Sequence, residues 1–419
     1  MPLLAPLTAP GTPEPANVAR GRLRARGMFQ ADGEGKLDFL QARLGSDGDV
    51  QRIGGTPWAV DWSGDFSLRE GDAWSGTGLD RPDFELYRLS LYRRYDDGGF
   101  LRAGRFLPQE LPSVGYVDGI QREVGLSEHF RLGGIAGLKP DRRDLDPSAK
   151  EPMAVAYGTV EGGKRGGLYA AGTAGILASM YEGKFDRLAV LLDGRADLGP
   201  KLSLYTTNEI DLDTGSAEHR EGVRVTHTDL QAISPVASFL TLRAGVDHFE
   251  RPDTRAERDL LPTGDPRYFD RGYWRYWLGA TEYLPWKIRL DEEIALMDAP
   301  GEDLTPRWRL AATRTGLPGL SAGQLTLTVY NLDGAGAEGY GGQLSAFLPF
   351  LDGRLSVRPA AGFRFLETDA TSESFELADL SLHTDWWISK AWSVYAGVTG
   401  TFGDSVDRVL IDIGVDFRW

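Results

Sequence analysis

The last eleven residues of the chain alternate strictly between two kinds of side chain. The odd positions of 409–419 hold Val, Ile, Ile, Val, Phe and Trp, whereas the even positions are mostly charged or small. Successive side chains of a β-strand point to opposite faces of the sheet. This segment therefore predicts a strand with one apolar face and one polar face.

The same alternation recurs along the whole chain. It is clear in the segments 22–29, 201–212, 239–247, 286–296, 354–365 and 392–402. These segments are about 10–13 residues long, whereas strands of water-soluble domains are usually about 5–6 residues and a tilted strand needs about 9–11 residues to cross a bilayer. No helical periodicity of similar quality is found. The pattern predicts an all-β protein whose strands span a membrane.

The linkers between the predicted strands alternate in length. Counted back from Trp419, short turns are expected at 389–390, 351–353, 285, 235–236 and 199–200. Longer polar linkers are expected between them, at 367–374, 333–338, 299–305, 251–270, 213–221 and 140–150. Outer-membrane β-barrels have short periplasmic turns and longer outer loops, so both chain termini are expected on the periplasmic side.

A C-terminal alternating strand that ends in an aromatic residue resembles the closing strand of bacterial outer-membrane β-barrels. The resemblance covers most of the chain as architecture and singles out no family. It implies a transmembrane antiparallel up-and-down β-barrel with an even number of strands, about 18–22. It also implies that Phe417 and Trp419 are the signal read by the barrel-assembly machinery, and that outer-membrane lipid and lipopolysaccharide surround the protein.

Two parts of the chain depart from the regular pattern. Residues 1–18 are rich in Pro and Ala and predict a flexible tail, which leaves 19–419 as one barrel domain. Segment 108–126 is expected either to hold one more strand or to fold inward. It follows Gly104-Arg105, which is similar to the Gly-Arg pair that precedes the constriction loop of porins.

Composition limits the alternatives. The chain contains no Cys, which excludes disulfides, thiolate metal sites and cysteine nucleophiles. A net charge of −15 argues against general nucleic-acid binding, which needs a basic face. The start of the chain shows no signal peptide, and a leader is expected to have been removed or to lie upstream.

The polar face of the predicted strands carries many charged residues. A lipid-facing Arg or Lys near the bilayer centre costs about 2–4 kcal/mol, so these residues are expected to line the lumen. Charged rings set ion selectivity in pores. The selectivity candidates are Arg22, Arg24, Arg26, Arg243, Arg289, Arg307, Arg309, Arg354, Arg358, Arg364, Asp247, Asp291, Glu293, Asp412 and Asp416. The alternative is that these charges only pair with one another across strands.

Signs of enzyme chemistry are weak. The five His residues (His129, His219, His227, His248 and His383) have no zinc-binding spacing, so neither a metal nor a cofactor is expected. Ser381, His383 and Asp385 share one face of a predicted strand, which leaves an outer-membrane hydrolase as the enzyme alternative. We predict a protein that is not an enzyme.

Two functions from different classes fit this fold. The first is a porin-like channel for passive diffusion of small hydrophilic solutes, with an Arg-lined path for anionic ones. The second is a barrel with a filled lumen that serves as a scaffold or anchor in an envelope complex. Partners of either would include a second copy of the chain or another envelope protein. A soluble propeller or sandwich would need repeats or shorter strands, and the sequence has neither.

Overall fold

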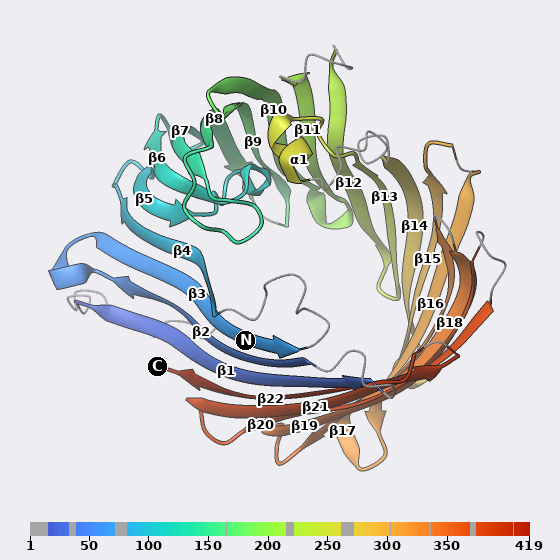
Figure 1. The fold of residues 1–419 in the computed structure, drawn as a ribbon. Helices are drawn as coiled ribbons and strands as arrows, with labels where there is room; N and C mark the ends of the chain where they lie inside the picture. Colours follow the sequence, from blue (N-terminus) through green and yellow to red (C-terminus); the bar gives the residue numbers. More distant parts are fainter. Residues whose placement is uncertain are drawn as a thin grey trace.

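The computed structural model describes residues 16–32, 39–71, 82–164, 166–214, 222–260, 272–301, 303–334, 337–368, 374–404 and 406–419. These residues form one antiparallel sheet of 22 strands (Figure 1). The strands are β1 (Val18–Asp32), β2 (Phe39–Gln51), β3 (Trp58–Gly71), β4 (Asp83–Arg94), β5 (Phe100–Phe106), β6 (Val117–Gly125), β7 (Phe130–Lys139), β8 (Glu151–Gly163), β9 (Leu168–Tyr181), β10 (Lys184–Leu198), β11 (Ser203–Thr214), β12 (Arg224–Ala237), β13 (Leu240–Phe249), β14 (Tyr273–Leu284), β15 (Ile288–Asp298), β16 (Thr305–Leu317), β17 (Leu320–Gly334), β18 (Ala337–Phe350), β19 (Leu355–Thr368), β20 (Ser374–Trp387), β21 (Trp392–Gly403) and β22 (Arg408–Arg418).

Short helices lie between some of these strands. They are η1 (Ile53–Gly55), η3 (Pro112–Val114), η4 (Gly199–Lys201), α1 (Arg255–Leu260) and η6 (Pro285–Lys287). No helix among the described residues is long and apolar enough to cross a membrane.

Each strand pairs with the next one in the sequence, and the last strand pairs with the first. β22 lies antiparallel to β1 from Arg418 opposite Arg22 to Arg408 opposite Asp32. The backbones of Gly21 and Trp419 also exchange two hydrogen bonds. The sheet is therefore a closed up-and-down barrel, which confirms the predicted fold class and the upper end of the predicted strand number.

Gly21 allows this last contact because it has no side chain. A Cβ atom at Gly21 would overlap the indole ring of Trp419, which lies over it. Phe417 stacks against Trp419, with ring centroids 5.9 Å apart, and packs against Trp392 at 4.6 Å. The two residues predicted as an assembly signal therefore belong to an aromatic cluster beside the seam between β22 and β1.

The register divides each strand into an inner and an outer face. On β22, Asp412 lies opposite Gly397 and is buried, whereas its neighbour Ile413 is exposed on the outside. Exposed aromatic rings gather on the outer face near both ends of the barrel, where such rings favour the boundary between lipid and water. Examples are Tyr276 and Trp308 near one end and Trp386 near the other.

Other aromatic residues near the strand ends face inward. Trp277 lies opposite Gly245 on the inner face, and the Arg275 guanidinium lies 5.6 Å from its ring centroid. Tyr273 and Trp387 have the inner parity as well. The predicted turn at 235–236 was also misplaced, because Pro235 and Val236 belong to β12.

We expect a charge on the outer face of β22 to hinder assembly far more than the same charge on the inner face of β21. Ile413→Arg places a guanidinium at an outward-facing position in the middle of β22, which costs about 2–4 kcal/mol in a bilayer. Thr399→Arg places it on the inner face. Folding into lipid vesicles can be followed by heat-modifiable mobility in gels. Equal folded fractions for the two variants would contradict the assignment of the faces.

Candidate functional site in the lumen

One side of the inner wall is apolar and covered. Ile135, Met153, Val155 and Leu177 point inward from β7, β8 and β9 and are buried. The cover is the β5–β6 connection 107–116, called here the inward segment. Its Leu111 is only 1% exposed and belongs to the same buried cluster. Burial of a Leu or Val side chain contributes about 1.5–3 kcal/mol, so this cluster holds the inward segment against the wall.

The sequence around the inward segment explains why the chain leaves the wall here. β5 has 7 residues, far fewer than most of the other strands. Gly104 has φ +119, a conformation in which a side chain would be strained, and a Cβ there would collide with the Leu89 carbonyl. Gly175 leaves space for Leu111, since a Cβ at Gly175 would lie 2.9 Å from Leu111 Cδ1. Segment 108–126 thus contains all of the inward segment except Leu107, followed by strand β6.

Arg105 fastens the start of the inward segment. Its Nε and Nη2 donate to the two carboxylate oxygens of Asp118, each at 2.6 Å. Its Nη1 donates to the Leu86 carbonyl at 2.8 Å and to the Leu145 carbonyl. This buried arginine, which belongs to the Gly104-Arg105 pair, therefore joins β4, β6 and the loop 140–150.

A second segment enters the barrel from the β13–β14 loop. Residues 250–260 carry α1, which lies inside the ring of strands next to β10 and β11 (Figure 1). The backbone N–H of Arg255 donates to Asp186 Oδ1 at 2.6 Å, and the N–H of Glu257 donates to Thr254 Oγ1 at 3.1 Å. The Tyr181 hydroxyl donates to Asp259 at 2.7 Å. The first turn of α1 is therefore capped partly by its own loop and partly by the barrel wall.

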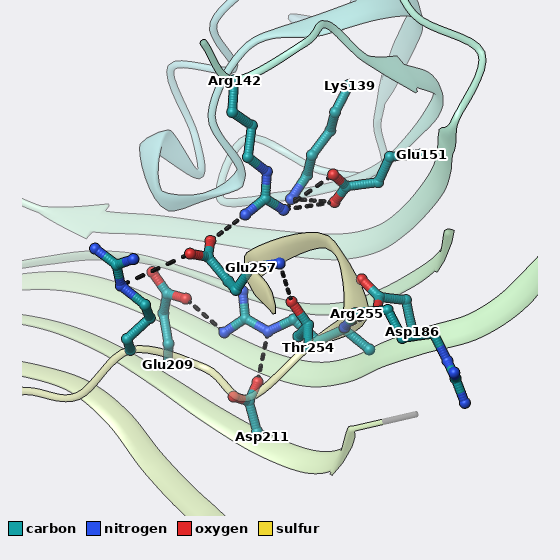
Figure 2. Close-up of polar contacts among 11 residues, drawn as sticks. Lys139, Arg142, Glu151, Asp186, Glu209, Asp211, Thr254, Arg255 and Glu257 are labelled. Atoms are coloured by element: carbon teal, nitrogen blue, oxygen red, sulfur yellow. Dashed lines mark hydrogen bonds and ion pairs between the residues drawn. The ribbon is translucent and has the colours of Figure 1, made fainter. Parts of the chain in front are cut away.

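Ion pairs connect α1 to the loop 140–150 and to the wall. Figure 2 shows Arg142 and Lys139 both reaching Glu151, with Arg142 also reaching Glu257 on α1. The distances from Glu151 are 2.8 Å to Arg142 Nη2 and 3.2 Å to Lys139 Nζ. Burial alone would lower the pKa of Arg142, but Glu151 and Glu257 raise it above its usual value. Arg142 thus stays charged and bridges the loop to the helix.

Arg187 forms the centre of a neighbouring cluster on the wall. It donates to Asp211 at 2.6 Å and to Glu209 at 2.8 Å, and all three side chains are mostly buried. Removing one partner of a buried pair leaves an uncompensated charge, which costs far more than the pair itself contributes. The cluster therefore holds β10 and β11 in one register on the inner wall.

The opposite side of the inner wall is polar and accessible to water. The side chains of Arg26, Arg289 and Arg358 are 46%, 49% and 53% exposed although they point into the lumen. No described segment covers the inner faces of β14–β22 and β1 as the inward segment covers β7–β9. Among the described residues, the inner wall is therefore covered along one side and exposed along the other.

The structure places most selectivity candidates in ion pairs. The pairs are Arg22 and Arg24 with Asp47, Arg26 with Asp412, Arg289 with Asp291, Arg358 with Asp385, and Arg364 with Asp379. Asp247 and Glu293 are both bound by Arg275, from the strand between theirs. The inner wall thus alternates in sign over short distances instead of forming one basic and one acidic side.

The remaining selectivity candidates are Arg243, Arg307, Arg309, Arg354 and Asp416. Arg243 and Arg309 have no carboxylate partner among the described residues, and they lie on one row of the sheet that runs from Arg243 through Gly279 and Glu293 to Arg309. Arg307 precedes Arg309 on the same face of β16. Arg354 lies in the turn before β19, where it donates to the Leu351 carbonyl at 3.4 Å. Asp416 lies on the inner face of β22 opposite Ser393.

Several lumen residues were missed by the sequence analysis. Arg43, Arg102, Arg275, Glu110 and Glu123 all face the lumen or the cavity described below. β5 and β6 are short and the register of β3 with β4 shifts at Ser63/Gly64, which obscures the alternation there. Arg275 lies within an aromatic run. Arg43 lies directly opposite Arg26 in the β1–β2 hairpin. Residues that pair across two strands lie on the same face, so the position of Arg26 would have identified Arg43 as a lumen residue.

The enzyme alternative gains no support from geometry. His383 Nδ1 lies 4.0 Å from Asp412 Oδ1, and its Nε2 lies 3.5 Å from Thr399 Oγ1. Among the described residues, Ser381 makes no hydrogen bond to His383. No group of three or more His, Asp and Glu side chains in the described part of the chain is arranged to hold a metal ion.

Comparisons with known proteins give similarity of architecture. No protein-family model and no curated protein matches the sequence. Among solved structures, the translocation pore of the P pilus usher PapC has a TM-score of 0.49 at 12% identity, over 95% of this chain and 99% of that one. Pseudomonas aeruginosa OccK5 (OpdH) also has a TM-score of 0.49 at 12% identity, over 96% and 97%. Sequence identities and TM-scores this low say nothing of what this chain does.

We expect Arg142→Gln to loosen α1 without unfolding the barrel. The change removes the bridge from Glu151 to Glu257 and leaves both carboxylates short of a partner, a loss of about 1–3 kcal/mol. Hydrogen–deuterium exchange of residues 253–260 should rise about tenfold or more, while exchange in β14–β22 stays unchanged. Lys150→Gln, an exposed change in the same loop, serves as the control. Unchanged exchange in α1 would show that the bridge does not hold the helix.

Proposed function

We propose that this protein is an integral outer-membrane channel for passive diffusion of small hydrophilic solutes. The observation that carries the proposal is the water-accessible inner wall of β14–β22 and β1, with charged side chains about half exposed inside a closed barrel. A barrel whose outer face is apolar and whose inner face is charged is suited to lipid outside and water inside.

The bilayer orientation and surroundings belong to the same proposal. The end at which β1 begins and β22 ends carries mostly short turns and faces the periplasm. Lipid and lipopolysaccharide contact the outer face, and the barrel-assembly machinery recognises Phe417 and Trp419 on β22. Association with a second copy of the chain is compatible with this arrangement.

The scaffold with a filled lumen is the second candidate function. The covered wall of β7–β9 and the docking of α1 favour it, because these segments occupy one side of the interior. The wet side favours the channel, since a barrel that served only as a scaffold would gain stability by filling it. We regard the inward segment and α1 as constrictions that narrow the pore.

The channel is also proposed to favour anions. Most lumen carboxylates are neutralised by an arginine, whereas Arg309 is exposed and has no carboxylate partner among the described residues, and neither has Arg243. Fixed charges without partners set the local potential that a passing ion meets. These two arginines would carry the preference.

Single-channel conductance in a planar bilayer tests the pore. A folded, heat-modifiable barrel should give steady conductance in potassium chloride. Absence of conductance from such a barrel would reject the channel and favour the scaffold.

The double variant Arg243→Gln/Arg309→Gln tests the anion preference. Because it removes two unpaired positive charges, we expect the reversal potential in a salt gradient to shift towards cation preference. The control is the double variant Arg195→Gln/Asp197→Asn, which removes an arginine together with its paired carboxylate and leaves the net charge unchanged. The same reversal potential in the double variant and the parent would reject the role of these two arginines.

A further inference from the structure

A polar cavity lies in the inner wall under the inward segment. Its volume is about 460 Å³, and it is bounded by β2–β7 and the β4–β5 turn. Gln109 and Glu110 of the inward segment contribute to its lining. A volume of this order is suitable for a small solute with some water.

The basic part of the cavity centres on Arg102. Its guanidinium lies over three aromatic rings, with its Cζ 5.4 Å from the centroid of Tyr92, 5.9 Å from that of Phe100 and 5.8 Å from that of Phe106. Arg102 Nε is buried and makes no hydrogen bond, and no carboxylate of the described residues pairs with this side chain. A guanidinium attracted to the faces of aromatic rings can still use its edge for a carboxylate, which it binds through two parallel hydrogen bonds.

The acidic part of the cavity includes a deeply buried carboxylate. Glu123 is 2% exposed, and its Oε1 accepts a hydrogen bond from Arg131 Nε at 2.8 Å. The Glu123 carboxylate also interacts with the Tyr157 hydroxyl, which itself accepts a hydrogen bond from Gln121 Nε2 at 2.8 Å. Glu110 also lines the cavity, and its Oε2 accepts one hydrogen bond from Gln121 at 3.0 Å. These oxygens retain capacity for a further donor.

The lining carries charges of both signs, since it also contains Asp47, Asp49, Asp61, Arg88, Arg94 and Arg131. A solute with only one kind of charge therefore meets repulsion from part of it. A simple anion could pair with Arg102 but would face Glu110 and Glu123. A simple cation could pair with the carboxylates but would face Arg102. A solute that carries both charges satisfies both parts. Hydrogen bonds to charged groups contribute more than those between neutral groups, so a solute that pairs with both parts is favoured.

We propose that this cavity binds small zwitterions that carry a carboxylate and an ammonium group, as α-amino acids do. Arg102 holds the carboxylate, and Glu110 and Glu123 hold the ammonium group. The site rests on the proposed function, because solutes must enter the lumen to reach it. The inward segment positions Glu110 through its neighbour Leu111, which is anchored in the apolar cluster, so the site is formed before the solute arrives.

Binding to the refolded protein in detergent micelles tests the proposal by isothermal titration calorimetry. The probes are L-glutamine, 4-carbamoylbutanoate, which lacks the ammonium group, and 4-aminobutanamide, which lacks the carboxylate. We expect L-glutamine to bind roughly tenfold more tightly than either of the others, because a hydrogen-bonded charge pair is lost in each. Equal affinity for all three, or no binding to a heat-modifiable barrel, overturns the proposal.

Two variants assign the roles within the cavity. Arg102→Gln should weaken L-glutamine binding roughly tenfold and leave 4-aminobutanamide binding as tight or tighter. Glu110→Gln should weaken L-glutamine and leave 4-carbamoylbutanoate unchanged or tighter. Arg195→Gln, which changes an arginine elsewhere on the inner wall, should keep the parent affinities. If Arg102→Gln lowers the affinity for all three probes equally, the assigned role of Arg102 is wrong.

Conductance without solute separates this site from the proposed function. Steady conductance in potassium chloride together with no selective binding rejects the zwitterion site and leaves the channel standing. Selective binding without conductance supports the site and rejects the open channel.

Discussion

Backbone N–H and C=O groups inside a bilayer have no water to bond, so every one of them must find a partner within the protein. In this chain that requirement is met by the pairing of β22 with β1, which removes the two free edges that a sheet of 22 strands would otherwise have. Closure also defines an inside and an outside. The parity of every strand, and hence the position of every charge, depends on it.

Once the barrel is closed, the interior must accommodate its own polar groups. The structure does so differently on its two sides. Near β7–β11, the inward segment buries an apolar cluster, and loop 140–150 and α1 join the ion pairs around Glu151. On the other side, arginines and carboxylates alternate across neighbouring strands and remain in contact with water. The first side gives rigidity, and the second gives the path proposed for solutes.

The cavity beside Arg102 lies where these two sides meet. The inward segment makes one side of the cavity rigid, and the open wall contributes polar side chains to the other side. A passive pore with such a pocket beside its path would retain one class of solute longer than others, because each passing molecule samples the same preformed set of charges. The proposed transport therefore depends on the open wall, and the proposed selectivity depends on the inward segment that borders the cavity.

Much of the architecture could be predicted from the order of residues alone. Alternation has a period of two regardless of tertiary context, so segments such as 409–419 showed both the strands and their apolar faces. The energetic penalty for a lipid-facing charge further determined which residues lie inside. The alternation of short turns and longer loops then indicated an up-and-down barrel.

Tertiary structure decided how the interior is occupied. Parity places Arg364 and Arg309 on the same inner face. Only the register between strands pairs Arg364 with Asp379 and leaves Arg309 without a carboxylate partner in the described part of the chain. Nor does any local pattern show that Glu257 would meet Arg142, more than a hundred residues away in the chain. Such contacts depend on how loops fold back into the lumen. The sequence by itself therefore determined the wall of this protein, whereas the shape and chemistry of its interior arose from contacts between distant segments.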